Sequence, residues 1–181
     1  MTLHATAKPS HARDTDAATV AALAIAVIAA LTLAGAWFFQ LVLDIRPCPL
    51  CLEQRYAWYL AIPLGVLLAL AASRGAPRAL LVAGFALLTL ALLANAWLAG
   101  YHAGVEWGFW PGPTACTGTG GDLSFGDLSS GTIDKVIPCD QVQWRDPILK
   151  FSLAGYNTLL SAAIVVMLLG AMLFQSRRKA G

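Results

Sequence analysis

The stretch ALLVAGFALLTLALLANAWLAGY, residues Ala79–Tyr101, runs from Arg78 to His102 without one charged side chain. At about 1.5 Å per residue, a helix of this length crosses a hydrocarbon core of about 30 Å. Backbone groups in hydrocarbon must be satisfied by helices or closed barrels. Because the apolarity is continuous rather than alternating, it argues against a barrel strand. The stretch therefore predicts a transmembrane helix.

Three further runs have the same character and lie at residues 17–43, 56–73 and 151–176. The chain is 58% hydrophobic and 12% charged, whereas soluble domains carry about 25% charged residues. We therefore predict an all-α membrane protein that folds as a four-transmembrane-helix bundle. Its single membrane domain spans 17–176, with helices at about 17–43, 52–73, 79–101 and 151–176, loops at 44–51 and 102–150, the second long and partly irregular, and tails at 1–16 and 177–181.

The first run has one feature of a signal peptide, because Ala34-Gly35-Ala36 resembles a cleavage site. However, the apolar stretch continues to Leu43 and is much longer than the roughly 7 to 15 residues of a signal core. We expect a retained helix.

The distribution of basic residues predicts the orientation. Both tails and the loop between the second and third helices hold seven of the twelve Lys and Arg residues, whereas residues 44–55 and 102–150 hold eight of the ten acids. By the positive-inside rule both termini are expected in the cytoplasm. All four cysteines then lie at or beyond the outer surface. The net charge of +2 follows from this topology, and no nucleic-acid partner is indicated.

The four cysteines are Cys48 and Cys51, in the stretch RPCPLCLEQR (46–55), and Cys116 and Cys139. Four cysteines allow three pairings, and an outer location favours disulfides. The preferred resting state joins Cys48 to Cys51 and Cys116 to Cys139. A C-x-x-C is a poor structural staple because closing so short a loop removes little chain entropy. Purely structural bridges and a four-cysteine zinc site remain as alternatives, the latter with unsuitable spacing.

Local chemistry favours a reactive Cys51. Pro47 and Pro49 predict that the second helix begins around Leu50, which places Cys51 in the first turn, where the helix dipole favours a thiolate. Arg55 follows at i+4 on the same face. An interfacial arginine that extends toward the headgroups is the alternative explanation of Arg55.

These residues carry a family resemblance. The motif C-x-L-C-x-x-x-R at the outer start of the second helix, four spans, and His102 ahead of a second cysteine pair resemble the DsbB family of bacterial membrane disulfide-generating oxidoreductases. The resemblance covers Trp37 through the fourth helix. One departure is Gln54, which stands where some members have an acid.

The resemblance implies a bacterial inner-membrane enzyme that reoxidises a periplasmic DsbA-like thiol oxidase and reduces a membrane quinone, ubiquinone or menaquinone. Cys116 and Cys139 would be the catalytic pair that oxidises the partner, and Cys48 and Cys51 the pair that reduces quinone. Cys139 would attack Cys48. Arg55 and His102 would lie near the quinone head. No metal is implied.

Other function classes stay open. One is a quinone reductase of the vitamin K epoxide reductase type, although its C-x-x-C is expected later in the chain. Another is a non-enzymatic four-span protein with structural disulfides.

Several polar and irregular features carry further predictions. Asn95 and Asn157 are expected to form interhelical hydrogen bonds, and Glu106 has no assigned role. Residues 110–116 are expected to be extended and to dock in a partner's groove, and residues 117–132 to form a tether. The Cys116–Cys139 pair is expected to lie in water. All tryptophans and tyrosines are expected in the outer part of the protein.

Overall fold

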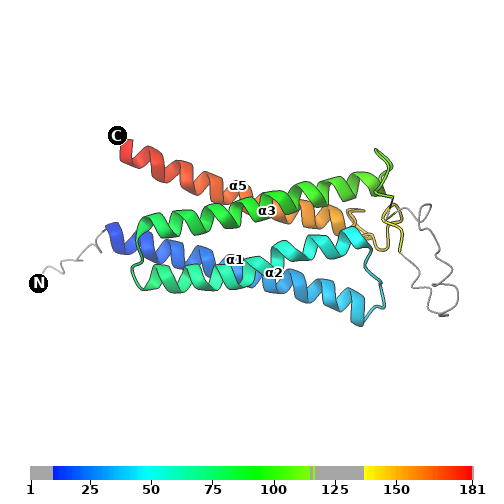
Figure 1. The fold of residues 1–181 in the computed structure, drawn as a ribbon, viewed down its shortest axis with the longest axis horizontal. Helices are drawn as coiled ribbons and strands as arrows, with labels where there is room; N and C mark the ends of the chain where they lie inside the picture. Colours follow the sequence, from blue (N-terminus) through cyan, green and yellow to red (C-terminus); the bar gives the residue numbers. More distant parts are fainter. Residues whose placement is uncertain (1–9, 115, 117–136, 181) are drawn as a thin grey trace, which may run out of the picture.

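The computed structural model describes residues 10–114, 116 and 137–180. Its helices are α1 (Ser10–Leu41), α2 (Pro49–Ser73), α3 (Arg78–Glu106) and α5 (Leu153–Ala180). Figure 1 shows that they lie lengthwise beside one another, with the start of α1, the α2–α3 turn and the end of α5 at one end of the bundle. The connections that carry the cysteines lie at the opposite end. The predicted four-helix bundle is confirmed.

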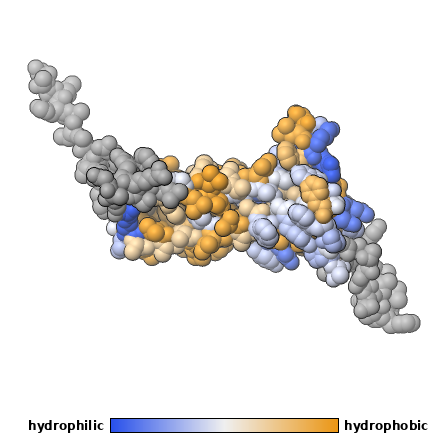
Figure 2. All heavy atoms as spheres, turned by 90° about the horizontal axis from the view of Figure 1, so that it is seen from above, coloured by the Kyte–Doolittle hydropathy of each residue, from blue (hydrophilic) through white to orange (hydrophobic). Residues whose placement is uncertain are grey.

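Each helix contains a segment that is long and apolar enough to cross a membrane: Asp16–Leu41, Pro49–Ser73, Arg78–Glu106 and Leu153–Met172. On the face drawn in Figure 2, apolar residues cover the middle of the bundle and polar residues gather toward the end with the long loop. This distribution is the one expected of a chain whose middle contacts lipid and whose ends contact water. The protein is a multi-pass membrane protein.

The helices pack as α1 on α2, α3 on α5, and α2 on α3. Large buried side chains such as Trp58, Leu88 and Ile164 form the central core. Small residues let α1 and α2 approach closely, because a Cβ atom on Gly65 would lie 2.9 Å from the carbonyl oxygen of Ala22. Close backbone approach through small residues is a common way for helices to associate in membranes.

Asparagines join the helices within the bundle. The side-chain amide of Asn95 on α3 lies 3.2 Å from that of Asn157 and 3.0 Å from the hydroxyl of Ser161, both on α5. Asn157 also accepts a hydrogen bond of 2.9 Å from the Trp58 indole on α2. The predicted interhelical role of both asparagines is confirmed.

The helix ends differ from the predicted boundaries. α1 and α5 extend into the stretches predicted as tails. α2 begins at Pro49 rather than 52, because Cys48 caps it and a proline is well suited to the first helical position. α3 continues past 101 to Glu106, and Gly108, with φ +74°, provides the left-handed conformation that commonly ends a helix. His102 therefore lies on a helix rather than in a loop.

Candidate active site

The first part of the site is the N-terminus of α2. Cys48 is the capping residue, with an extended backbone (φ −74°, ψ 166°), and its Sγ accepts a hydrogen bond of 3.2 Å from the backbone N–H of Cys51. Pro49 occupies the first helical position. Cys51 therefore lies in the first helical turn, as the sequence predicts, where backbone N–H groups favour an anionic sulfur.

The second part is the pair Cys116 and Cys139, which is disulfide-bonded with a Cα–Cα distance of 5.2 Å. The expectation that this pair lies in water is wrong, because Cys116 is 1% exposed and Cys139 is fully buried. The two sulfurs pack in an apolar cluster with Cys48, Leu50 and Val105. The cluster places the cysteines of the long loop directly on the start of α2.

Cys48 and Cys51 are both thiols in the structure, so the bridge predicted between them is not formed. Their sulfurs lie 2.8 Å apart, which is beyond the roughly 2.05 Å of a disulfide and corresponds to a hydrogen bond between the two groups. That hydrogen bond, together with burial, raises the pKa of the Cys48 thiol.

The two cysteine pairs meet at Cys48. The sulfurs of Cys48 and Cys139 and a ring nitrogen of His102 lie within 4.8 Å of one another. Such a group of atoms can hold a metal ion, but the Cys139 sulfur is bonded to Cys116 and is not a thiolate. The proximity is suited to thiol–disulfide exchange between the pairs.

His102 contacts Cys48 rather than the cavity described below. Its Nε2 lies 3.6 Å from the Cys48 sulfur, and its Nδ1 lies 2.8 Å from Nε2 of Gln54. Gln54 also donates to the Leu50 carbonyl (3.1 Å) and accepts from Nδ2 of Asn157 (2.7 Å). The sequence singled out Gln54 only as a departure from the family pattern, whereas the structure makes it the link between the imidazole and α5.

Glu106, which the sequence left without a role, belongs to the same cluster. Its side chain is 7% exposed, and one oxygen lies 3.9 Å from Nε2 of His102, one helical turn away. Its other oxygen accepts a hydrogen bond from Ser152 at the start of the segment leading into α5. The i, i+4 spacing from His102 was the signal that could have identified it.

A cavity of about 300 Å³ opens between α1, α2 and α5. Cys51 and Arg55 contribute to its wall, and most of the remaining lining is apolar, from residues such as Leu31, Phe39 and Leu160. Gln54 and Asn157 also line it, so the cavity and the His102 network share a wall. His102 is not among the lining residues, and its predicted place near a quinone head therefore stays a prediction.

Arg55 is held by α1. It is 9% exposed, and its guanidinium donates to the side chain of Gln40 (2.7 Å) and to the carbonyl of Ala36 (3.4 Å). It also lies 5.3 Å from the ring centroid of Trp37, within cation–π range. These contacts exclude an arginine that merely extends toward the headgroups. Within the described part of the chain, Nε of Arg55 is buried without a hydrogen-bond partner.

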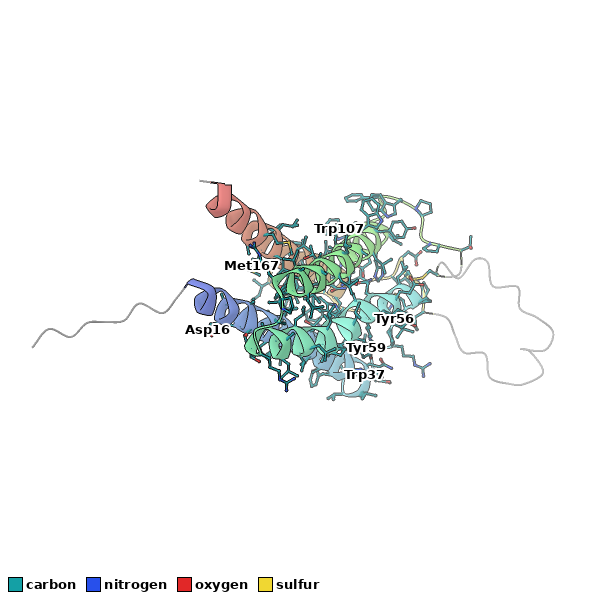
Figure 3. The ribbon with its side chains drawn as sticks, turned by 60° about the vertical axis from the view of Figure 1, so that its left-hand side comes forward. Asp16, Trp37, Tyr56, Tyr59, Trp107 and Met167 are labelled. Atoms are coloured by element: carbon teal, nitrogen blue, oxygen red, sulfur yellow. A yellow bond between two sulfur atoms is a disulfide. The ribbon has the colours of Figure 1, made fainter. Side chains whose placement is uncertain are left out.

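The tryptophans and tyrosines labelled in Figure 3, Trp37, Tyr56, Tyr59 and Trp107, lie toward the cysteine end of the bundle, away from Asp16. All four are exposed, as expected of aromatic side chains at a membrane interface. Residues 110–114 are not helical, and the extended docking role of 110–116 stays a prediction. The predicted tether, 117–132, lies outside the described residues.

A family model described as disulfide bond formation protein DsbB matches residues 18–171. The chain belongs to the DsbB family. It is also 29% identical over 143 residues to the disulfide bond formation protein B of Polaromonas sp. (strain JS666 / ATCC BAA-500), covering 75% of this chain and 79% of that protein. No solved structure matches the chain. DsbB membership and the two cysteine pairs identify an oxidoreductase of disulfide bond formation, rather than a membrane protein with purely structural disulfides.

Proposed function

We propose that this protein is a thiol:quinone oxidoreductase of the bacterial inner membrane. It reoxidises a DsbA-like periplasmic thiol oxidase by disulfide exchange and passes the electrons to a membrane quinone. Both termini lie in the cytoplasm, and both cysteine pairs face the periplasm. The proposal rests on DsbB family membership and on the meeting of two cysteine pairs at one end of the bundle.

The observation that carries the proposal is the position of Cys48. Its sulfur lies within 4.8 Å of the Cys139 sulfur and 2.8 Å from that of Cys51. A sulfur that contacts both pairs can exchange disulfides between them through a mixed disulfide. The order of exchange is then partner, Cys116–Cys139, Cys48–Cys51.

In the proposed exchange, a thiolate of the partner attacks Cys116, and the Cys116–Cys139 bond breaks. Release of the oxidised partner leaves both loop cysteines reduced. Cys139 then attacks Cys48 of the Cys48–Cys51 disulfide, and Cys51 leaves as a thiolate. Cys116 attacks Cys139, which restores the loop disulfide and releases Cys48.

The cavity beside Cys51 fits the head of a quinone. A quinone ring is apolar with two carbonyl acceptors, and the cavity combines an apolar wall with Arg55, whose buried Nε has no partner among the described residues. Arg55 would hold a carbonyl, while Trp37 and Gln40 fix the guanidinium. A bound quinone would supply a two-electron sink. Ubiquinone and menaquinone share these carbonyls, so the lining residues do not select between them.

The proposed reaction needs a strong final electron acceptor on energetic grounds. Suppose that the partner has a reduction potential of about −120 mV and that the α2 dithiol has one near −270 mV, as in thioredoxin. Electron transfer from the partner to α2 is then uphill by roughly 150 mV, or about 7 kcal/mol for two electrons. Thiol exchange alone therefore cannot drive the reaction. Placing Cys51 at the cavity wall couples the last dithiol to the acceptor.

The test is quinone reduction by the purified protein supplied with a reduced DsbA-like oxidase. We expect catalytic loss of quinone absorbance that requires both proteins. Cys51→Ser is the matched inactive control, because Cys48 and the loop pair remain. Disulfides that exchange with the partner but never reduce any quinone would reject the acceptor, and disulfides inert to the partner would reject the whole proposal.

A further inference from the structure

The hydrogen bonds around Gln54 fix the protonation of His102. The Trp58 indole can only donate, so the atom of Asn157 that it contacts at 2.9 Å must be the oxygen Oδ1. The amide nitrogen of Asn157 then faces Gln54 and donates to its Oε1 at 2.7 Å. This assigns the oxygen of Gln54 and leaves its nitrogen for the remaining contacts.

The other contacts of Gln54 agree with this assignment. Its Nε2 lies 3.1 Å from the Leu50 carbonyl, which can only accept, and 2.8 Å from Nδ1 of His102. An amide N–H that points at Nδ1 requires a ring nitrogen without a proton. His102 is thereby a neutral imidazole whose proton sits on Nε2.

The surroundings of Nε2 are acceptors. The Cys48 sulfur lies at 3.6 Å and a carboxylate oxygen of Glu106 at 3.9 Å. The Nε2–H group therefore points toward the place where the two cysteine pairs meet.

We propose that Gln54 is a positioning residue that locks His102 as a hydrogen-bond donor to the Cys48 sulfur, so that Cys48 can depart as a thiolate when Cys116 re-forms the loop disulfide. The inference rests on the proposed exchange function and adds a role for this chain's own glutamine. An ionised acid at position 54 would accept a hydrogen bond from Nδ1–H and would favour the opposite tautomer.

The Cys116 thiolate attacks Cys139, the Cys116–Cys139 bond forms, and the Cys48–Cys139 bond breaks with its electron pair on Cys48. The proton that Cys116 gives up is matched by the one that Cys48 takes up. A sulfur of high pKa is a poor leaving group, and the hydrogen bond with Cys51 and burial raise the pKa of Cys48. Donors from His102 and from the Cys51 backbone offset this disadvantage.

The first test is ¹⁵N NMR of the histidine ring in the full-length protein. The chain has three histidines, so replacing His4 and His11 by Gln leaves only the signals of His102. We expect an unprotonated Nδ1 and a protonated Nε2 at neutral pH. Gln54→Glu should protonate Nδ1, whereas the exposed neighbour Glu53→Gln should change nothing. A protonated Nδ1 with Gln54 in place, or an unchanged ring in Gln54→Glu, would overturn the inference.

The second test measures the release of Cys48. Oxidised protein in quinone-free detergent is mixed with one equivalent of reduced DsbA-like oxidase, quenched with acid, and mapped for the Cys48–Cys139 link. Gln54→Leu should slow the decay of this link roughly three- to tenfold, and Glu53→Gln should not. Equal decay rates in the three proteins would overturn the role of Gln54.

The two proposals fail separately. If the wild type reduces no quinone but His102 shows the expected tautomer, the acceptor assignment is wrong and the Gln54 assignment stands. If the wild type reduces quinone and Nδ1 carries a proton, only the Gln54 inference is lost. The NMR result needs no substitution at 54, so it decides the tautomer even if Gln54→Leu does not fold.

Discussion

Cys48 and Cys51 are one helical turn apart, yet they face different surroundings. Cys48 is 2% exposed and lies among His102, Cys139 and the cap of α2, where the described polar groups have partners. Cys51 lies at the wall of a cavity whose arginine has one buried donor, Nε, without a partner among the described residues. In the proposed function, the paired network around Cys48 serves exchange between cysteines, and the incomplete one beside Cys51 leaves room for a ligand.

The largest effect is expected on the Cys48 side, where the loop cysteines meet α2. Cys139→Ser should abolish quinone-linked turnover, because the loop disulfide can no longer form. When the variant is mixed with the oxidised partner, its free Cys116 should open the partner's disulfide and accumulate a mixed disulfide with it, while the partner's other sulfur leaves as a thiolate. Nonreducing gels with peptide mapping measure this product. Cys116→Ser is the matched control and should trap nothing. Equal trapping by both variants would contradict the assigned order of attack.

At the cavity beside Cys51, Arg55→Met should raise the quinone concentration needed for half-maximal rate by about ten- to a hundredfold. The reason is that a charged hydrogen bond is worth roughly 1.5 to 3 kcal/mol. Steady-state oxidation of the reduced partner against quinone concentration measures it. Arg55→Lys should recover only part, because an ammonium lacks the planar fork.

Single-turnover exchange with the partner in quinone-free detergent is the control for Arg55→Met. Gln40→Leu removes one partner of the guanidinium and keeps its charge, so its effect should be smaller. If Arg55→Met alters quinone-free exchange as much as the quinone dependence, the arginine supports folding rather than the cavity.

Asn95 tests the network that joins α3 to α5. Asn95→Leu should lower the free energy of unfolding by about 1 kcal/mol, because interhelical hydrogen bonds in membranes have modest worth. Denaturation in mixed detergent micelles measures it. Thr89→Val, on the same helix, loses only a local bond to the Phe85 carbonyl and should cost less. An equal loss in both variants would show that the α3–α5 bonds contribute nothing.

The smallest effect concerns the ring beside Arg55. Trp37→Leu should weaken apparent quinone affinity by about two- to fivefold, because a cation–π contact contributes roughly 0.5 to 1 kcal/mol. The same quinone titration measures it, with Tyr59→Phe as control, since Tyr59 only accepts a hydrogen bond from the Trp37 indole. If Trp37→Leu leaves the quinone affinity unchanged, the Trp37 ring does not contribute to quinone binding and only Arg55 remains as the proposed contact.

The membrane spans could be predicted because a long uncharged run that crosses lipid must form a helix to satisfy its backbone hydrogen bonds. Asn95 and Asn157 were also predictable, since polar groups in hydrocarbon must find partners. The helix ends were not, because a cap such as Cys48 and a stop at Gly108 depend on local backbone geometry that hydropathy does not report. Hydropathy therefore locates spans better than it locates the residues at their ends.

In the candidate site, sequence spacing placed Cys51 and Arg55 on one face of one helix, and both line the cavity. Contacts between helices were out of reach, among them Arg55 with Gln40 and Gln54 with His102. The burial of Cys116 and Cys139 was missed for the same reason, since nothing local shows that the long loop folds back on α2. Gln40 is a polar residue in an apolar run, and this position could have indicated that its side chain has a polar partner on another helix.

The most direct test of the comparison is to identify which sulfur of α2 links to Cys139 during turnover. The protein is mixed with reduced partner and quinone, quenched with acid within the first turnovers, digested, and mapped for cross-linked peptides. The account predicts a Cys48–Cys139 link, because Cys48 contacts the loop pair and Cys51 lines the cavity. A Cys51–Cys139 link without any Cys48–Cys139 would contradict it.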